Sequence, residues 1–147
     1  METVKLTYEI DGENFNAAGD ASTAVKRVLK KLRLPPQVVR RAVVCMYEGE
    51  INMVIHAGGG EIDVDIAPDA VHMVLRDQGP GIQDISLAMQ EGWSTAPDDV
   101  RSLGFGAGMG LPNMKKYTDE MKVESTAGVG TTVTMTVFIH PQEEAVS

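Results

Sequence analysis

Residues 47–59 read YEGEINMVIHAGG, a mostly apolar segment that carries three regularly spaced polar residues. Glu48, Asn52 and His56 stand at i, i+4 and i+8, so they share one face if the segment is helical. Polar side chains in an apolar helix cost free energy unless they are satisfied, which makes a functional stripe the more specific interpretation. His56 taken alone is also typical of a hydrogen-bonded structural histidine.

The residue types in this stripe suit phosphate chemistry. Asn52 offers an amide oxygen of the kind that binds Mg²⁺, an ion that keeps several waters and shares phosphate oxygens. Glu48 lies one turn away and could accept a proton from a nucleophile. Gly49 between them costs a helix about 1 kcal/mol relative to alanine, which close approach of another backbone or a ligand would explain.

Downstream, residues 75–84 read LRDQGPGIQD, in which an apolar strand ends at an aspartate before two glycines. An ionised carboxylate only accepts hydrogen bonds, so Asp77 could receive the exocyclic amine of adenine, where guanine presents an oxygen. The residue therefore predicts a pocket that selects ATP over GTP.

A second glycine-rich stretch, GFGAGMGLPNM, covers residues 104–114. The chain has no Gly-Lys-Ser/Thr tripeptide, and the glycines at 104, 106, 108 and 110 alternate instead of following G-x-G-x-x-G. Such glycines allow backbone amides to approach phosphates closely, and a helix that begins near Gly110 would direct its positive end at an anion.

Hydrophobic periodicity places these motifs on a mixed set of helices and strands. Asp20 is the expected N-cap of the first helix, Pro35 and Pro36 separate it from the second, and residues 92–109 are expected to be a loop. Because the order has no regular βαβ alternation, we expect an α+β fold with a mixed, mostly antiparallel sheet and helices on one face. Strands are expected at 4–10, 61–67, 71–77, 121–125 and 131–139, and helices at 20–32, 36–57, 84–91 and 111–119.

The length of 147 residues favours a single domain, expected over residues 1–140, followed by a frayed tail over 141–147. No segment reads as a membrane span or a signal peptide, so a cytoplasmic protein without membrane contact is expected. A net charge of −8 argues against direct nucleic-acid binding. Cys45, the single cysteine, lies among apolar residues and is expected to be a buried structural thiol.

Positive charge is concentrated in one part of this acidic chain. Residues 21–47 contain no acid, and they carry lysines and arginines at positions 26, 27, 30, 31, 33, 40 and 41. The segment is either a solvated helical face or a docking surface for an acidic partner protein.

In order and spacing, YEGEINMVIHAGG, RDQGPGI, GFGAGMGLPNMKK and GVGTTVTM resemble the N, G1, G2 and G3 boxes of the GHKL ATPase superfamily, which has the Bergerat fold. The resemblance covers about residues 1–140 and implies a two-layer α/β sandwich that binds ATP and Mg²⁺. The glutamate four residues before Asn52, the compact length and the segment GLPNMKKYTDEMKVES are similar to anti-sigma factor serine/threonine kinases and the stressosome switch kinase.

The resemblance implies a role for each matching residue. Glu48 would be the catalytic base, Asn52 would hold Mg²⁺, and Asp77 would bind adenine. Arg101 is the candidate for a γ-phosphate contact, whereas Glu50 is expected to face solvent. The remaining nucleotide-binding residues would be Gly79 and Gly81 at the adenine, Gly104, Gly106, Gly108, Gly110 and Leu111 in the lid, and Thr131 or Thr132 beside Asp77.

Two functions are compatible with this set of residues. The first is a serine/threonine kinase that phosphorylates a small antagonist protein in a partner-switching pathway. The second is a nucleotide-gated module that sequesters a sigma factor or another regulator without significant catalysis. Either could act as a homodimer. Loss of phosphoryl transfer on replacing Glu48, with ATP binding retained, would distinguish the kinase from the binding module.

Overall fold

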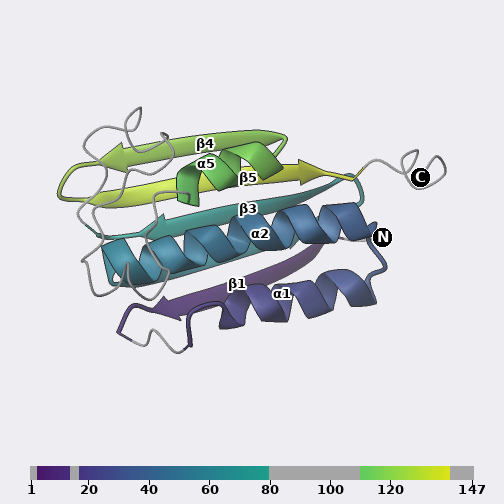
Figure 1. Cartoon of the computed structure of the whole chain (residues 1–147), viewed down its shortest axis with the longest axis horizontal. Helices are drawn as coiled ribbons and strands as arrows, with labels where there is room; N and C mark the ends of the chain where they lie inside the picture. The colour runs from purple at the N-terminus through teal and green to yellow at the C-terminus, as the bar shows by residue number, and fades with distance from the viewer. Residues whose placement is uncertain (1–2, 14–16, 80–109, 140–147) are drawn as a thin grey trace.

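Five strands form one sheet, and the helices cover one of its faces (Figure 1). The structure is a computed structural model that describes residues 3–13, 17–79 and 110–139. The elements are β1 (Val4–Asp11), α1 (Asp20–Lys31), α2 (Pro36–Asn52), the π-helical turn η2 (Met53–Ala57), β2 (Gly59–Ile66), β3 (Ala70–Asp77), α5 (Gly110–Tyr117), β4 (Glu120–Thr126) and β5 (Gly130–Phe138).

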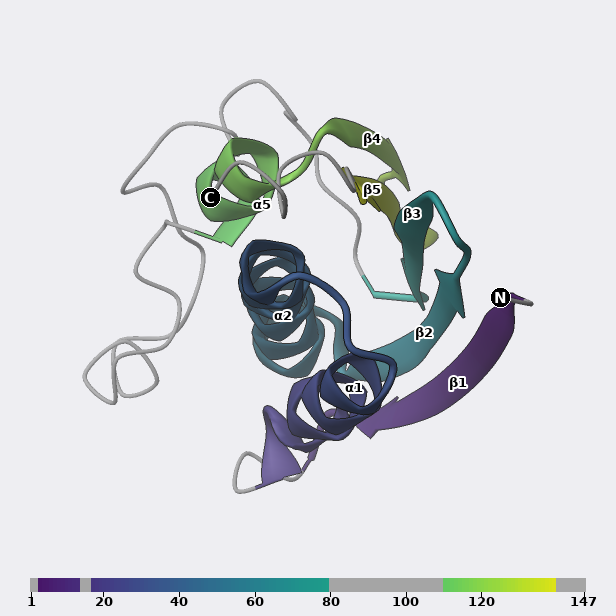
Figure 2. The ribbon, with the colours of Figure 1, turned by 90° about the vertical axis from the view of Figure 1, so that its right-hand side faces the viewer.

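The strands lie in the order β1-β2-β3-β5-β4, and each neighbouring pair is antiparallel. The expected α+β class, with a mostly antiparallel sheet and helices on one face, is confirmed, and every described strand pair is antiparallel. A short turn joins β2 to β3, and another joins β4 to β5. Short connections of this kind favour antiparallel pairing. Figure 2 shows the sheet curving around α1, α2 and α5.

Period-two alternation along the strands separates a core face from an open face. Ile62, Val64 and Ile66 of β2 are fully buried against the helices, whereas Glu61, Asp63 and Asp65 occupy the other face. Arg76 of β3 forms an ion pair with Asp63 across that open face. The alternation of apolar and polar residues in the sequence therefore predicts which side chains face the core and which face the open side of the sheet.

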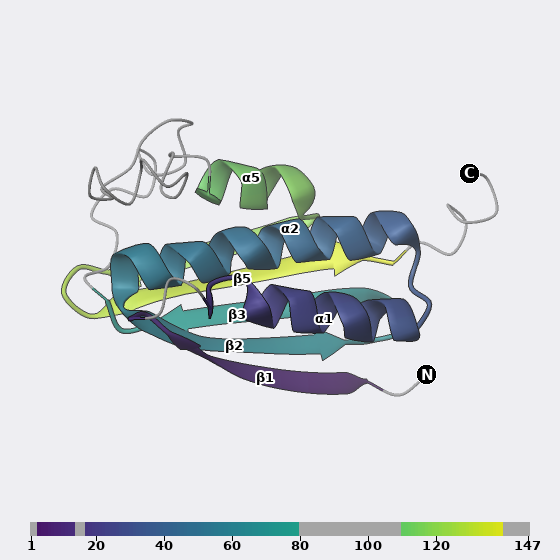
Figure 3. The ribbon, with the colours of Figure 1, turned by 60° about the horizontal axis from the view of Figure 1, so that its bottom comes forward.

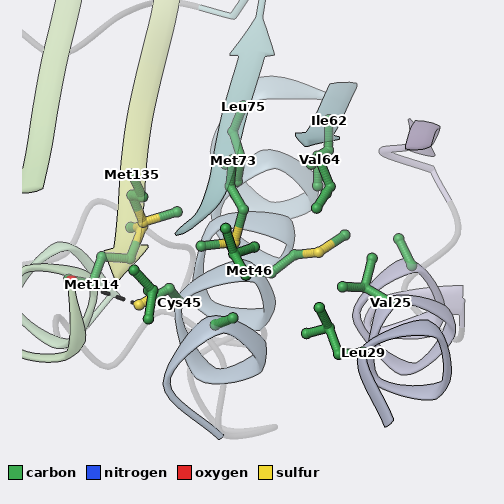
Figure 4. Packing of buried hydrophobic residues seen from close by; sticks show 14 of the residues in the cluster. Val25, Leu29, Cys45, Met46, Ile62, Val64, Met73, Leu75, Met114 and Met135 are labelled. Atoms are coloured by element: carbon green, nitrogen blue, oxygen red, sulfur yellow. Dashed lines mark hydrogen bonds between the residues drawn. The ribbon is translucent and has the colours of Figure 1, made fainter. Parts of the chain in front are cut away.

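The helical layer is packed mainly through aliphatic and methionine side chains (Figure 4). Met46, Met73, Met114 and Met135 are at most 1% exposed and join α2, β3, α5 and β5. Gly49 of α2 faces this cluster, where a β-carbon would collide with Leu75 of β3 and lie 3.7 Å from the sulfur of Met114. The missing side chain of Gly49, expected to permit a close approach, therefore leaves room for the core side chain of Leu75.

Glu50 corrects two sequence expectations, because it is buried and it caps α1. Its side chain is 1% exposed, and it accepts hydrogen bonds from the backbone amides of Gly19 at 2.8 Å and Ser22 at 3.0 Å. The Ser22 hydroxyl donates to it at 2.7 Å and the Ala21 amide at 3.3 Å. Gly19 is the N-cap and no side chain of α1 caps the helix, so the prediction of Asp20 as N-cap is wrong.

The second helix ends where the sequence predicts, but its last turn is wider than expected. α2 continues directly into η2, and Gly58 ends the helix in a left-handed conformation with φ of 72°. A π turn bonds i to i+5, so His56 leaves the register that an α-helix would give it. Glu48 and Asn52 remain within the α-helical part.

The expected helix at 84–91, the loop at 92–109 and the tail at 141–147 lie outside the described residues. Within the described ranges, no helix is both long enough and apolar enough to cross a membrane.

Candidate functional site

Polar residues from four elements meet at one end of the molecule. The C-terminal end of α2 continues through η2, β3 ends at Asp77, and β5 begins beside it with Thr131 paired to Asp77. The N-terminal end of α5 lies at the same end, above α2 (Figure 3). The antiparallel pairing of β3 with β5 thus brings together segments more than fifty positions apart in the chain.

Asp77 is held by the backbone on both sides. Its Oδ1 accepts hydrogen bonds from the Gly79 amide at 3.0 Å and from the Thr131 amide at 3.2 Å. Among the described residues no donor is bonded to Oδ2, so one carboxylate oxygen is available while the other fixes the orientation. The Thr131 hydroxyl lies 2.9 Å from Ser125 Oγ, and Thr132 pairs with Arg76 on the open face of the sheet.

Gly79 is required by the close packing of the segment after β3 on η2. A β-carbon on Gly79 would lie 2.6 Å from Cα of Ala57 and 2.7 Å from its Cβ. His56 precedes Ala57, and burial lowers the pKa of His56 while the negative charge of Asp77 raises it in part. The imidazole therefore lies within electrostatic reach of Asp77, which the i+8 spacing did not indicate.

Glu48 is half-buried on the side of α2 that faces α5. Its Oε1 accepts a hydrogen bond from Asn113 Nδ2 at 3.3 Å. Burial raises the pKa of Glu48, and the hydrogen bond from Asn113 lowers it in part. Asn113 was not singled out from the sequence, although it lies inside the quoted GFGAGMGLPNMKK motif, because the contact joins residues 65 positions apart.

Asn52 lies one turn beyond Glu48 and is only partly buried. Its side chain makes no hydrogen bond to another described residue. The described residues also contain no group of three or more histidine, cysteine or acidic side chains that could hold a metal ion. A single amide oxygen fits Mg²⁺ brought by a nucleotide, because this ion needs few protein ligands when phosphates and water supply the rest.

Helix α5 is fastened to α2 by polar contacts as well as by the methionine cluster. Arg41 Nε donates to the carbonyl of Tyr117 at 3.0 Å, and Arg41 Nη2 lies 3.0 Å from Asp119 Oδ1. One turn along α2, Cys45 Sγ donates to the carbonyl of Met114 at 3.7 Å. Cys45 is buried, as expected, and burial raises its pKa to about 12, which disfavours the reactive thiolate.

The structure describes some of the remaining predicted site residues and not others. Gly110 is the first residue of α5, where a helix start was expected, and Leu111 is 8% exposed within the core cluster. Gly81, Arg101, Gly104, Gly106 and Gly108 lie outside the described residues. The nucleotide contacts assigned to all of these residues remain predictions.

Comparison with known proteins places this geometry in a family. Residues 14–137 match the model of the histidine kinase-like ATPase domain. The chain is 32% identical over 112 residues to the serine/threonine-protein kinase RsbT of Bacillus subtilis. The aligned residues cover 74% of this chain and 78% of that protein. It is 36% identical over 144 residues to an anti-sigma F factor of Caldanaerobacter subterraneus, with 95% of this chain and 94% of that protein covered.

Solved structures support the fold at lower identity. The RsbU and RsbW domains of a Mycobacterium tuberculosis protein match 92% of this chain and 32% of that chain, with a TM-score of 0.63 and 18% identity. The mycobacterial sensor histidine kinase MprB matches 94% of this chain and 99% of that chain, with a TM-score of 0.52 and 17% identity. The family model matched over residues 14–137 and the two relatives show that the chain belongs to the histidine kinase-like ATPase domain family, as the GHKL resemblance implied.

Proposed function

We propose that this protein is an ATP-dependent serine/threonine kinase of the anti-sigma type, which phosphorylates a small antagonist protein in a partner-switching pathway. Use of ATP follows from membership of the family. The kinase and anti-sigma roles are supported by relatives named serine/threonine-protein kinase and anti-sigma F factor, of which the chain covers 78% and 94%.

The observation that carries this proposal is the placement of Glu48. The carboxylate has one oxygen bound by Asn113 and lies one turn from Asn52, whose side chain is unbonded among the described residues. A general base works best when its pKa approaches the working pH, and burial raises the pKa of Glu48 in that direction.

In the proposed reaction, Glu48 takes the proton from a serine or threonine hydroxyl of the partner as the hydroxyl oxygen forms its bond to the γ-phosphorus. The bond between that phosphorus and the β–γ bridging oxygen breaks, so the products are the phosphorylated partner and ADP. Bound ATP with Mg²⁺ supplies the phosphoryl group and part of the charge neutralisation. Asn52 would hold the ion through its amide oxygen, and Asp77 Oδ2 would accept the adenine amine.

The partners and boundaries are part of the same proposal. The acceptor would be a small antagonist protein, and a sigma factor or another regulator would be the protein released or captured in exchange. We further propose a single ATP-binding domain over residues 1–140, with a homodimer as a candidate assembly. Sedimentation of the purified chain over a range of concentrations tests the dimer.

Replacing the proposed base tests the kinase function directly. Glu48→Gln preserves size and the hydrogen bond from Asn113 but removes basicity, so phosphoryl transfer is expected to fall about 10²- to 10⁴-fold. Affinity for Mg-ATP should stay close to wild type. The measurement is transfer of radiolabel from ATP to the partner protein that co-purifies with the native chain, with Glu120→Gln on the exposed surface of β4 as the control.

Two outcomes would contradict this assignment. Transfer at the wild-type rate by Glu48→Gln would place the base elsewhere. A wild-type protein that holds its partner only with ATP, and never phosphorylates it, would instead be the nucleotide-gated binding module.

A further inference from the structure

An open groove lies between α1 and α2, and none of the candidate-site residues lines it. It has a volume of about 400 Å³. Its lining begins at the C-terminal half of α1, passes Leu34 in the connection, and continues along the first turns of α2. Figure 1 shows the two helices side by side on one face of the sheet.

The groove has an apolar floor with helical spacing. Val39 and Val43 stand at i and i+4 on α2, with Val44 beside them and Leu34 at the end of the groove. Val39 and Leu34 are largely buried in the core, whereas Val43 and Val44 are partly exposed. A floor of this kind suits the apolar face of an amphipathic helix laid across it.

The rim of the groove is positively charged. Lys26 and Lys30 stand one turn apart on α1, and Arg40 faces them from α2; all three are exposed. Among the described residues none of these three takes part in an ion pair, unlike Arg41, which is bound to Asp119. Residues 21–47 supply no acid to neutralise them, in a chain whose net charge is −8.

We propose that this groove, defined by Lys26, Lys30, Arg40 and the apolar floor between them, is a docking site for an acidic amphipathic helix of a partner protein. Apolar side chains of that helix would enter the groove, and its flanking carboxylates would meet the three cations. Charge complementarity selects an acidic segment, because a basic or neutral one would leave the rim unpaired.

The groove and the candidate site use different residues of α2. Arg40 and Asn52 are 12 residues apart on one helix, which corresponds to about 18 Å along its axis. Val44, at the other end of the lining, is one turn, about 6 Å, from Glu48, so a partner held at the rim cations docks beside the candidate site through residues that the site does not use. The docking site is independent of whether Glu48 acts as the base.

A synthetic amphipathic peptide tests the proposal on the full chain. The probe carries leucines along one helical face and glutamates beside them, and a second peptide replaces every glutamate with lysine. In NMR spectra of the isotope-labelled protein, the acidic peptide should shift the methyl signals of Val39, Val43 and Val44, and the basic peptide should not. Binding should weaken as salt is added, because exposed charges are screened within about 10 Å at 0.1 M ionic strength.

Matched variants on one helix separate the groove from general electrostatics. Lys26→Glu/Lys30→Glu should weaken binding of the acidic peptide by about tenfold or more, because the rim then repels it. Arg27→Glu/Lys31→Glu changes the net charge of the same helix equally, at exposed residues that do not line the groove, and should have little effect. Val44→Thr should weaken binding by about fourfold through loss of one buried methyl group.

Several results would overturn the proposal. These are equal binding of both peptides, equal loss in the two charge-reversal variants, or shifts confined to residues outside the groove. If Lys26→Glu/Lys30→Glu abolishes a concentration-dependent dimer, a second copy of the chain is the occupant. If the acidic peptide binds only after residues 140–147 are removed, the occupant is the chain's own terminal segment.

Discussion

Asp77 is the residue that carries the proposed preference for adenine. One carboxylate oxygen is fixed by the amides of Gly79 and Thr131, and the other is unbonded among the described residues. A fixed acceptor matches the amine of adenine and opposes the carbonyl oxygen that guanine has at that position. Preorganisation by two backbone amides means that binding does not have to order this side chain.

Asp77→Asn should therefore weaken ATP binding by about 1 to 3 kcal/mol, the cost of losing a charge-assisted hydrogen bond. The wild type should bind ATP and ADP in preference to GTP, and the variant should lose that preference. Calorimetric titration of both proteins with each nucleotide measures the effect. Equal affinities of the wild type for ATP and GTP would remove Asp77 from the adenine site.

Asn113 provides a pH-dependent test of the environment of Glu48. Its hydrogen bond lowers the pKa of Glu48, which burial raises, so Asn113→Leu should raise that pKa further. Because a base must be ionised to act, the acid limb of the rate–pH profile should move to higher pH. Lys115→Gln, at an exposed residue of the same helix, should leave the profile unchanged. A variant of Asn113 that lowers the rate equally at every pH would indicate a structural role only.

Among the elements, α1 depends on α2 for its N-terminal cap. The first amides of a helix lack intrahelical partners, and Glu50 supplies acceptors for three of them together with the Ser22 hydroxyl. The carboxylate also complements the positive end of the helix dipole. One side chain therefore couples α1 and α2, the two helices of this layer that border the groove.

Glu50→Gln should destabilise the fold by about 1 to 3 kcal/mol, because a buried amide nitrogen would face backbone donors and leave them unsatisfied. Chemical denaturation measures the change, and Glu120→Gln on β4 is the exposed control. Amide exchange should accelerate first in α1, since its N-terminal turn loses its acceptors. A variant as stable as wild type would show that water replaces the carboxylate without cost.

The molecule as a unit should respond to nucleotide through stability. A ligand that binds only the folded state adds about 2.7 kcal/mol of stability at a concentration of 100 times its dissociation constant. Mg-ATP should therefore raise the melting temperature of the wild type, GTP should raise it less, and Asp77→Asn should reduce the shift with ATP. Differential scanning fluorimetry with each nucleotide provides the measurement. A melting temperature that no nucleotide changes would contradict ATP binding by the isolated chain.

Much of the fold was predictable because its local patterns are strong. Alternation along β1, β2, β3 and β5 indicated the strands. The glycines after Ala57 indicated where a helix ends, and Pro35 and Pro36 indicated where α2 begins. The positions of Glu48, Asn52 and Asp77 were recognisable because helical spacing and motif order are properties of the chain itself. These features need only neighbours within a few residues, which a sequence displays directly.

The tertiary structure alone decided which distant groups satisfy one another. Glu50 was expected in solvent, yet it faces α1, because the direction of a side chain is known only once the neighbouring helix is placed. Asn113 reaches Glu48 across 65 positions, and Thr131 reaches Asp77 across 54, through the packing of α5 on α2 and the pairing of β5 with β3. Burial and hydrogen-bond partners arise from contacts between elements, so the sequence specified the functional groups and the packing specified the pKa of Glu48 and the orientation of Asp77.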